Sequence, residues 1–326
     1  IFSTFNNLQD ISLDPLYGSL VGFTEEEIKA SFDEYLINAS VILKTSVKDV
    51  LNKLKQNYNG FCFDEKAQFK VYCPWSVLNF FNRPDSGFQN YWYTSGGQPT
   101  VLMKYLVNHA LSQPINYSEV KEVRLSALNA ARQYDEIGVD VLLTEAGYYT
   151  IREVTEDQYA ILGYPNQEVA ISMAQLYADE LLNGQRLRNP GSSPLSRVMS
   201  QSTAQEVVEQ FNFAVNAIDY QRYPINDEAS CRAYLQVLLI GAAMIPRVEV
   251  HNALGRSDME VEIGNRHWVF EFKYAKSSTE INELLQHAVD QIQSRHYGNK
   301  ADGRQLIRVA LVFSGEERRF AAWKMI

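Results

Sequence analysis

The 326-residue sequence has few cysteines, no phosphate-loop motif and no long apolar run. Its three cysteines, Cys62, Cys73 and Cys231, follow no disulfide or metal-site spacing, which argues against a disulfide-bonded secreted domain and a zinc cluster. The pattern G-x-x-x-x-G-K-[ST], which cradles nucleotide phosphates, does not occur. Without a signal peptide or an apolar stretch of membrane length, we expect a cytoplasmic protein that makes no membrane contact.

Net positive charge is also missing. The chain carries 30 Lys+Arg against 39 Asp+Glu, a net charge of −9. Residues 227–326 contain equal numbers of basic and acidic side chains, so the whole net charge lies upstream of them. A neutral region binds nucleic acid only through a local basic patch. Candidates for such a patch are Arg232, Arg247, Arg256, Lys276, Arg295, Lys300 and Arg304.

A predicted β-hairpin brings two acidic residues together. If Gly264-Asn265 forms a two-residue turn, Ile263 faces Arg266, and counting outward places Asp258 opposite Glu271. Directly opposed residues have Cβ atoms about 5 Å apart, so two carboxylates repel each other unless a cation lies between them. Hard oxygen ligands with no cysteine nearby favour Mg²⁺ or Mn²⁺.

The alternation of the two strands predicts a core face and a face that carries chemistry. Lys273, two residues after Glu271, points to the same side and is placed to orient or help deprotonate a water molecule. The alternative is a solvated hairpin face with one salt bridge. The predicted core face holds Met259, Val261, Ile263, Trp268, Phe270, Phe272 and Tyr274, and the other face holds Arg256, Asp258, Glu260, Glu262, His267, Val269, Glu271 and Lys273.

Asp258 followed by Glu271-Phe272-Lys273 resembles the D…(D/E)xK signature of the PD-(D/E)XK nuclease superfamily, whose core is an α-β-β-β-α-β unit. The resemblance implies that Asp258 and Glu271 bind the metal, with the Phe272 carbonyl as a further ligand and Lys273 positioning the attacking water. The flanking sequence fits this order. It predicts a helix over 227–244, a strand over 247–253, the hairpin, a helix over 278–297 and a strand over 306–313.

The resemblance also implies that a glutamate of the first helix joins the metal site, which here is Glu228. The alternative reading is structural. In it Asn226 is the N-cap, and Asp227 and Glu228 are ordinary first-turn carboxylates favoured by the helix dipole.

A glutamine and a tyrosine on the later helix recur in related nucleases. Gln291 with Tyr297 matches this pair, and Gln293 with Tyr297 matches it at a shorter spacing. Gln291 lies on the apolar stripe that faces the predicted sheet, so we expect Gln291 to support the site.

The resemblance extends upstream to one bacterial family with an AAA-ATPase-like region before the nuclease domain. It rests on residues 5–12, 22–27, 58–61, 79–81 and 91–93. In that family the phosphate loop precedes the segment at which this chain begins. We therefore expect a fragment without ATPase activity, in a protein that would bind ATP only through a region outside this fragment.

The predicted fold class is mixed α+β in three parts. Residues 1–113 form a helical, ATPase-lid-like region, residues 114–225 a winged-helix-like and helical connector, and residues 226–326 a restriction-endonuclease-like domain. The acidic character of the connector favours a protein contact over DNA binding. Its predicted elements are helices at 120–134, 137–146 and 168–182 and a hairpin formed by 147–151 and 159–162.

The sequence thus predicts a metal-dependent nuclease that hydrolyses phosphodiester bonds, with DNA preferred to RNA as the partner. One alternative is a non-cleaving nucleic-acid or protein binding module on the same fold. Another is a regulatory module of an ATP-driven assembly. The complete set of Asp258, Glu271 and Lys273 argues for cleavage, since a decayed site usually loses a charged member first.

Overall fold

The computed structural model describes residues 11–94, 120–129, 137–182, 195–242, 244–299 and 303–326. Its internal contacts divide them into two units, one ending at Met173 and the other beginning at Ala174. The predicted connector contributes to both units, and the three-part division stays a prediction. None of the helices in the described ranges has the length and apolar character needed to cross a bilayer.

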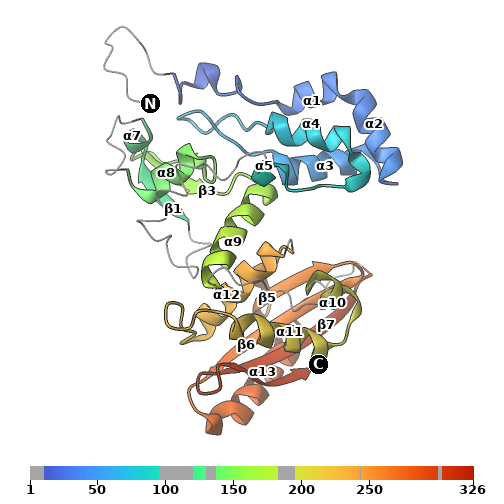
Figure 1. The fold of residues 1–326 in the computed structure, drawn as a ribbon, viewed down its shortest axis with the longest axis vertical. Helices are drawn as coiled ribbons and strands as arrows, with labels where there is room; N and C mark the ends of the chain where they lie inside the picture. Colours follow the sequence, from blue (N-terminus) through green and yellow to red (C-terminus); the bar gives the residue numbers. More distant parts are fainter. Residues whose placement is uncertain (1–10, 95–119, 130–136, 183–194, 243, 300–302) are drawn as a thin grey trace. The chain divides into compact units, whose positions relative to one another are not determined.

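The first unit starts with short helices (Figure 1). Aliphatic and aromatic side chains form the core between them. Thr24 and Ser46 each cap a helix by accepting a backbone N–H, as their positions before a helical pattern predict. Phe80 stacks on Phe88 with ring centroids 4.4 Å apart, so these aromatic residues are core. The elements are η1 (Pro15–Tyr17), α1 (Glu25–Ser31), α2 (Asp33–Ile42), α3 (Val47–Tyr58), α4 (Pro74–Asn82), η2 (Pro84–Ser86) and α5 (Tyr91–Thr94).

A three-stranded antiparallel sheet of order β1-β3-β2 completes this unit. The predicted hairpin is present as β2 and β3. The helix expected from Val120 is wrong at its start, because residues 121–124 pair with 159–162 as a strand and the helix begins only at Leu125; residues 130–134 lie outside the described ranges. The winged-helix assignment stays a prediction. The elements of this unit are β1 (Lys121–Arg124), α7 (Leu125–Leu128), α8 (Val139–Glu145), β2 (Thr150–Val154) and β3 (Tyr159–Gly163), while α9 (Gln167–Leu181) begins in this unit and ends in the second.

Glu168 makes the first unit sensitive to pH. Its buried carboxylate accepts hydrogen bonds from the Ser76 hydroxyl at 2.7 Å and the Tyr91 amide at 3.1 Å. Burial outweighs these bonds and raises the pKa of Glu168 from 4.5 to about 7. Between these two values the folded chain keeps a proton that the unfolded chain releases, so the free energy of unfolding falls as pH rises, by at most about 3 kcal/mol.

Glu168→Gln is expected to remove this decrease. The amide stays neutral, and the Ser76 hydroxyl can turn to accept from it. Denaturant unfolding at pH 5 and pH 8 measures the effect. Glu34→Gln, on the exposed surface of α2, should keep the wild-type pH dependence. If the free energy of unfolding changed equally between pH 5 and pH 8 in wild type and in Glu168→Gln, Glu168 would not titrate in this range.

The second unit is a five-stranded mixed sheet of order β4-β5-β6-β7-β8, covered by helices on both faces. Only β6 and β7 are parallel, joined through α13. The sequence α12, β4, β5, β6, α13, β7 confirms the expected α-β-β-β-α-β order, and β8 adds an edge strand. The elements are α10 (Leu195–Gln201), α11 (Ala204–Asn216), α12 (Glu228–Gly241), β4 (Arg247–Asn252), β5 (Gly255–Ile263), β6 (Arg266–Ala275), η5 (Ser278–Glu280), α13 (Ile281–Arg295), β7 (Gln305–Ser314) and β8 (Arg319–Met325).

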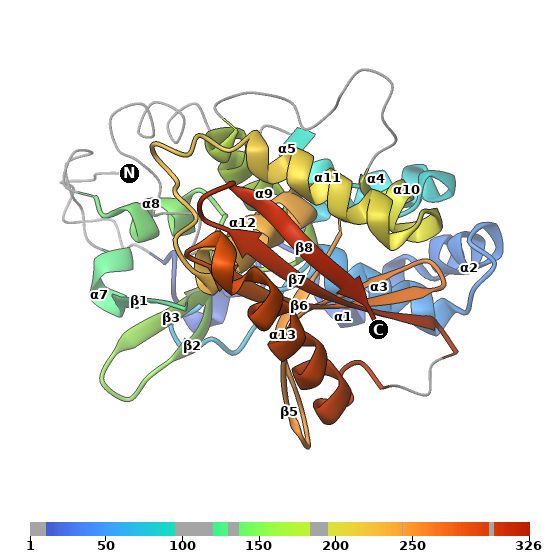
Figure 2. The same ribbon diagram turned by 90° about the horizontal axis from the view of Figure 1, so that it is seen from below.

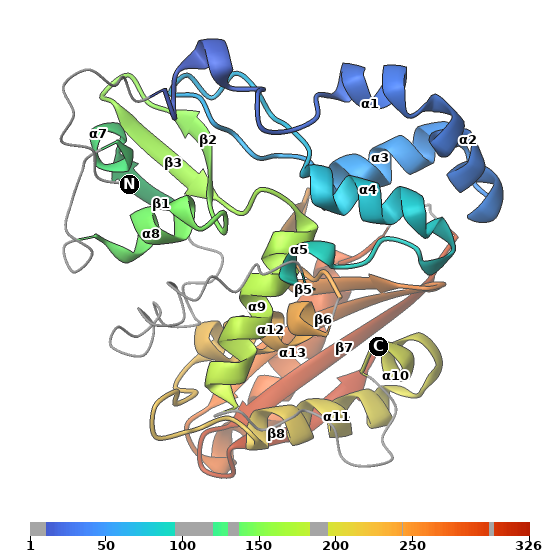
Figure 3. The ribbon, with the colours of Figure 1, turned by 45° about the horizontal axis from the view of Figure 1, so that its top comes forward.

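Helix α11 lies over one face of the sheet and α13 over the other (Figures 2 and 3). The predicted core face is buried, with Phe270 5.3 Å from Phe211 of α11 between ring centroids. The opposite face is also largely buried, because α13 packs on it around Val269. Glu260 and His267 are 3% and 1% exposed there and form a pair at 3.0 Å. Glu260, His267, Val269 and Glu271 of the expected polar face are therefore buried, whereas Arg256 stays exposed.

Candidate functional site

The two strands that carry the predicted carboxylates form the predicted hairpin. Ile263 pairs with Arg266 across the Gly264-Asn265 turn, which confirms the register. The ladder between β5 and β6 begins one residue after Asp258. At Asp258 a side-chain hydrogen bond replaces the main-chain pairing, because the Asp258 carboxylate accepts the Phe272 amide at 2.8 Å. Asp258 thus lies where the two strands separate.

Glu271 projects from β6 into a buried position. It is 0% exposed, and among the described residues its Oε2 atom has no hydrogen-bond partner. Burial and the nearby Asp258 carboxylate raise the pKa of Glu271 to about 7. A carboxyl group in such a position is stable only if it keeps its proton or if a cation balances its charge.

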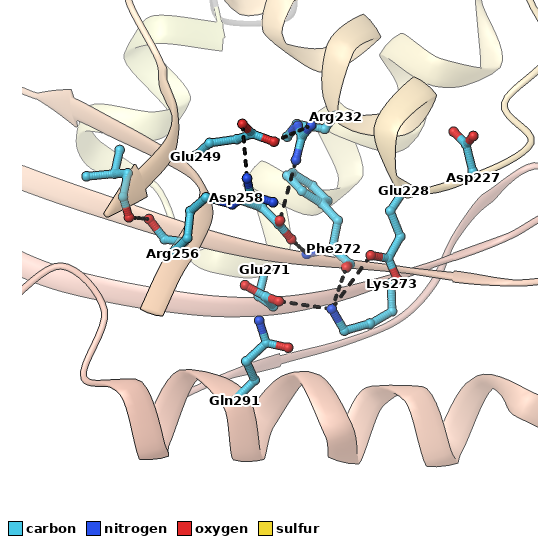
Figure 4. Close-up of polar contacts among 12 residues, drawn as sticks. Asp227, Glu228, Arg232, Glu249, Arg256, Asp258, Glu271, Phe272, Lys273 and Gln291 are labelled. Atoms are coloured by element: carbon cyan, nitrogen blue, oxygen red, sulfur yellow. Dashed lines mark hydrogen bonds and ion pairs between the residues drawn. The ribbon is translucent and has the colours of Figure 1, made fainter. Parts of the chain in front are cut away.

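Lys273 supplies positive charge beside Glu271 (Figure 4). Its Nζ atom lies 2.9 Å from Glu271 Oε1, 3.1 Å from the Phe272 carbonyl oxygen and 3.8 Å from Glu228 Oε2. Burial alone lowers the pKa of Lys273, but the carboxylates around it, Glu271 first, outweigh burial and raise it. Lys273 is therefore a charged hydrogen-bond donor. Whether Lys273 orients a water molecule or helps to deprotonate it stays a prediction.

Helix α12 places Glu228 next to Lys273. The helix cap is Asp227, whose carboxylate accepts the Ser230 amide at 2.7 Å. The assignment of Asn226 as the cap is wrong, because it is Asp227 that has the extended backbone and makes the capping bond. Burial raises the pKa of Glu228, opposed by Lys273. Glu228 is thus a first-turn carboxylate at the edge of the site, and its role as a ligand stays a prediction.

Gln291 points from α13 toward Glu271 (Figure 4). Its amide donates to the Tyr297 hydroxyl at 3.1 Å, while Gln293 on the next face is exposed. The structure therefore joins the Gln291 and Tyr297 pair that the sequence suggested. Whether Gln291 acts in a reaction stays a prediction.

Two site residues escaped the sequence-based prediction. Arg232 of α12 lies 3.0 Å from Glu249 Oε1 and 3.6 Å from Asp258 Oδ1. Arg232 follows Glu228 by four residues and so shares its helix face, which is a usable signal. Glu249 lies opposite Asp258 across β4 and β5, and counting outward from an Ala253-Leu254 turn would have found it.

Four arginines of the candidate basic patch form ion pairs within the unit. Paired arginines have less charge to offer a phosphate, so the described part of the chain gives no strong basic surface around the hairpin. Lys300 lies outside the described ranges. The pairs are Arg232 with Glu249, Arg247 with Glu262, Arg256 with Glu249 and Arg304 with Glu262.

The donor set fits a hard divalent cation through two carboxylates and a main-chain oxygen. Within the described ranges, no group of three or more His, Cys, Asp or Glu side chains is placed to hold a metal ion. Glu271 Oε2, which is buried and without a hydrogen-bond partner among the described residues, nevertheless has the chemistry of a ligand. The Asp258 carboxylate is near enough to raise the pKa of Glu271, and the Phe272 carbonyl accepts from the same Lys273 ammonium that pairs with Glu271. Oxygen donors of this kind suit Mg²⁺ or Mn²⁺.

Residues 228–323 match a family described as the PD-(D/E)XK nuclease superfamily. This match spans Asp258, Glu271, Lys273 and Gln291, and it confirms the superfamily assignment of the C-terminal region. The AAA-ATPase-like assignment stays a prediction.

The chain is also similar to a longer protein, "Uncharacterized protein in vnfD 5'region" of Azotobacter chroococcum mcd 1. The two are 26% identical over 333 residues, an alignment that covers 98% of this chain and 59% of that protein. The chain thus spans 59% of the length of this curated relative. No solved structure matches the chain.

Proposed function

We propose that the second unit is a metal-dependent nuclease that hydrolyses phosphodiester bonds, with DNA preferred to RNA. The observation that carries this proposal is the environment of the Glu271 carboxylate. Its buried Oε2 atom lacks a partner next to Asp258, on the strand that bears the E-F-K motif. A structural salt bridge with Lys273 explains only Oε1, which leaves Oε2 for a ligand.

Each residue has a role that its contacts support. Asp258, Glu271 and the Phe272 carbonyl would hold Mg²⁺ or Mn²⁺, with Glu228 at the edge, and the cation would supply electrostatic stabilisation of a phosphate and lower the pKa of water. Charged Lys273 donates hydrogen bonds, so it orients the attacking water and stabilises negative charge on phosphate oxygens. The water oxygen forms a bond to phosphorus and gives up a proton to solvent as the ester bond breaks. The departing oxygen takes a proton from solvent.

Cleavage of single- and double-stranded DNA and RNA, with Mg²⁺, Mn²⁺ or EDTA, tests this function. Wild type should cleave with either metal and stop in EDTA, while Asp258→Ala and Lys273→Ala should lose activity. If both variants cleaved as fast as wild type, the proposal would be wrong. Binding of nucleic acid in EDTA without cleavage in Mn²⁺ would favour a non-cleaving module instead.

Gln291 provides a graded test. Gln291→Ala is expected to lower cleavage about tenfold, because groups that orient a metal site typically contribute 10- to 100-fold. Gln293→Ala, two residues along the same helix and exposed, is the matched control and should stay within about twofold of wild type. Thermal unfolding of both variants separates a loss of activity from a loss of structure. Equal activity in the two variants would place Gln291 outside the site.

A further inference from the structure

A chain of alternating charges leads from the surface to Asp258 (Figure 4). Arg256 Nη1 lies 3.2 Å from Glu249 Oε2, and Glu249 Oε1 lies 3.0 Å from Arg232 Nη2. The other guanidinium nitrogen of Arg232, Nη1, is 3.6 Å from Asp258 Oδ1. The Arg232 and Asp258 side chains are only 20% and 16% exposed. Arg232 therefore bridges two carboxylates, one of them a proposed metal ligand.

The Glu249 carboxylate that contacts Arg232 comes from a residue with an unusual backbone conformation. Its φ is +53°, in the left-handed region that glutamate rarely adopts, and this within a strand. The paired residues of β4 and β5 step from Val248 with Met259 to Val250 with Ser257, passing over Glu249 and Asp258. Strained backbone of this kind persists when surrounding contacts fix it, and it concentrates at functional sites.

We propose that Arg232 exchanges between Asp258 and a phosphate of the substrate, with Glu249 as the residue that positions it. This inference rests on the proposed function. Before a cation binds, Arg232 shares the charge of Asp258 and competes with the cation. Once a cation is bound to Asp258, repulsion turns the guanidinium away, and Glu249 keeps it at the site. A planar guanidinium suits a phosphate oxygen pair, so Arg232 then binds the nucleic acid backbone.

The exchange predicts opposite effects of one substitution. Arg232→Gln removes the competitor, so calorimetry with Mn²⁺ and no nucleic acid should show a Kd lower by roughly threefold or more. At saturating Mn²⁺ the same variant should have a higher KM for DNA, because a phosphate contact is lost. If Arg232 were purely structural, its substitution would weaken the binding of both Mn²⁺ and DNA. Arg319→Gln, whose arginine begins β8 and pairs with Glu317, is the charge-matched control and should leave both values unchanged.

A double-mutant cycle separates positioning from general charge effects. Glu249→Gln should weaken Mn²⁺ binding, because Arg232 then pairs fully with Asp258. In the Arg232→Gln background the same change should have little effect. Long-range electrostatics alone would give additive shifts in Kd, and that result overturns the role of Glu249.

The outcomes distinguish this inference from the function on which it rests. A wild-type chain that neither binds Mn²⁺ nor cleaves overturns both. A wild-type chain that binds Mn²⁺, with an unchanged or weaker Kd in Arg232→Gln, overturns the exchange alone. If Arg232→Gln does not fold, Arg232→Lys serves in its place. It keeps the charge but not the fork that spans both carboxylates, so it too should bind Mn²⁺ more tightly than wild type.

Discussion

Glu271→Gln is expected to abolish Mn²⁺ binding and to lower cleavage on the order of a thousandfold. The substitution keeps the shape of the side chain but removes the charge of a buried carboxylate whose Oε2 atom has no other partner among the described residues. A neutral amide can still offer an oxygen ligand, but it carries no charge to balance the cation in a buried position. Calorimetry with Mn²⁺ and a cleavage assay at saturating metal measure the two effects.

The same residue gives this reaction a pH dependence. The pKa of Glu271 is raised to about 7, mainly by burial and next by Asp258. Below this value the carboxyl carries a proton that must leave before a cation binds, so the Kd for Mn²⁺ should rise about tenfold per pH unit below 7 and level off above it. Titrations between pH 6 and pH 8 check this slope.

The control for both measurements is Glu262→Gln. Glu262 lies on β5, as Asp258 does, but pairs with Arg247 and Arg304 away from the proposed ligands. The variant should bind Mn²⁺ and cleave as wild type does. If Glu271→Gln cleaved at the wild-type rate, Glu271 would be a structural carboxylate and the proposed reaction would need another site.

The core of the candidate site could be predicted because it depends on local sequence. Gly264-Asn265 fixes a two-residue turn, the turn fixes the register, and the register places Asp258 near Glu271. The helices on either side carry clear apolar periodicity. Their order around the hairpin could therefore be read without knowing how distant segments meet.

Features that depend on distant partners were not predicted. The strand at 121–124 exists because residues 159–162 lie alongside it, and its own sequence has the propensity of a helix. The burial of Glu271 comes from α13, which alternation along β6 cannot reveal. The left-handed φ of Glu249 is a tertiary effect with no local signal in the sequence. The contact of Arg232 with Asp258 joins a helix to a strand, so from the sequence Arg232 was only one basic residue among several.

Trp268→Ala is expected to destabilise the second unit by about 3 to 5 kcal/mol, the usual range for a buried tryptophan. Trp268 lies on β6, three residues before Glu271, and is fully buried. Its indole N–H donates to the Met199 carbonyl of α10 at 2.8 Å, and its ring stacks with Phe270 at 5.8 Å between centroids. The substitution therefore leaves a cavity between the sheet and α10 and removes the indole hydrogen bond, so that the Met199 carbonyl keeps only the longer contact from Arg266 Nη1 at 3.4 Å.

Trp268→Phe separates these two contributions. The phenyl ring fills most of the space but cannot donate, so the expected loss is about 1 kcal/mol for the hydrogen bond plus a smaller cavity term. Hydrogen exchange of the β6 amides in increasing denaturant reports on this unit alone. Leu254→Ala, 57% exposed in the turn between β4 and β5, should change the unfolding free energy by less than about 0.5 kcal/mol. If Trp268→Ala were as stable as Leu254→Ala, the indole would not be holding α10 to the sheet, and the site on β6 would depend on other contacts.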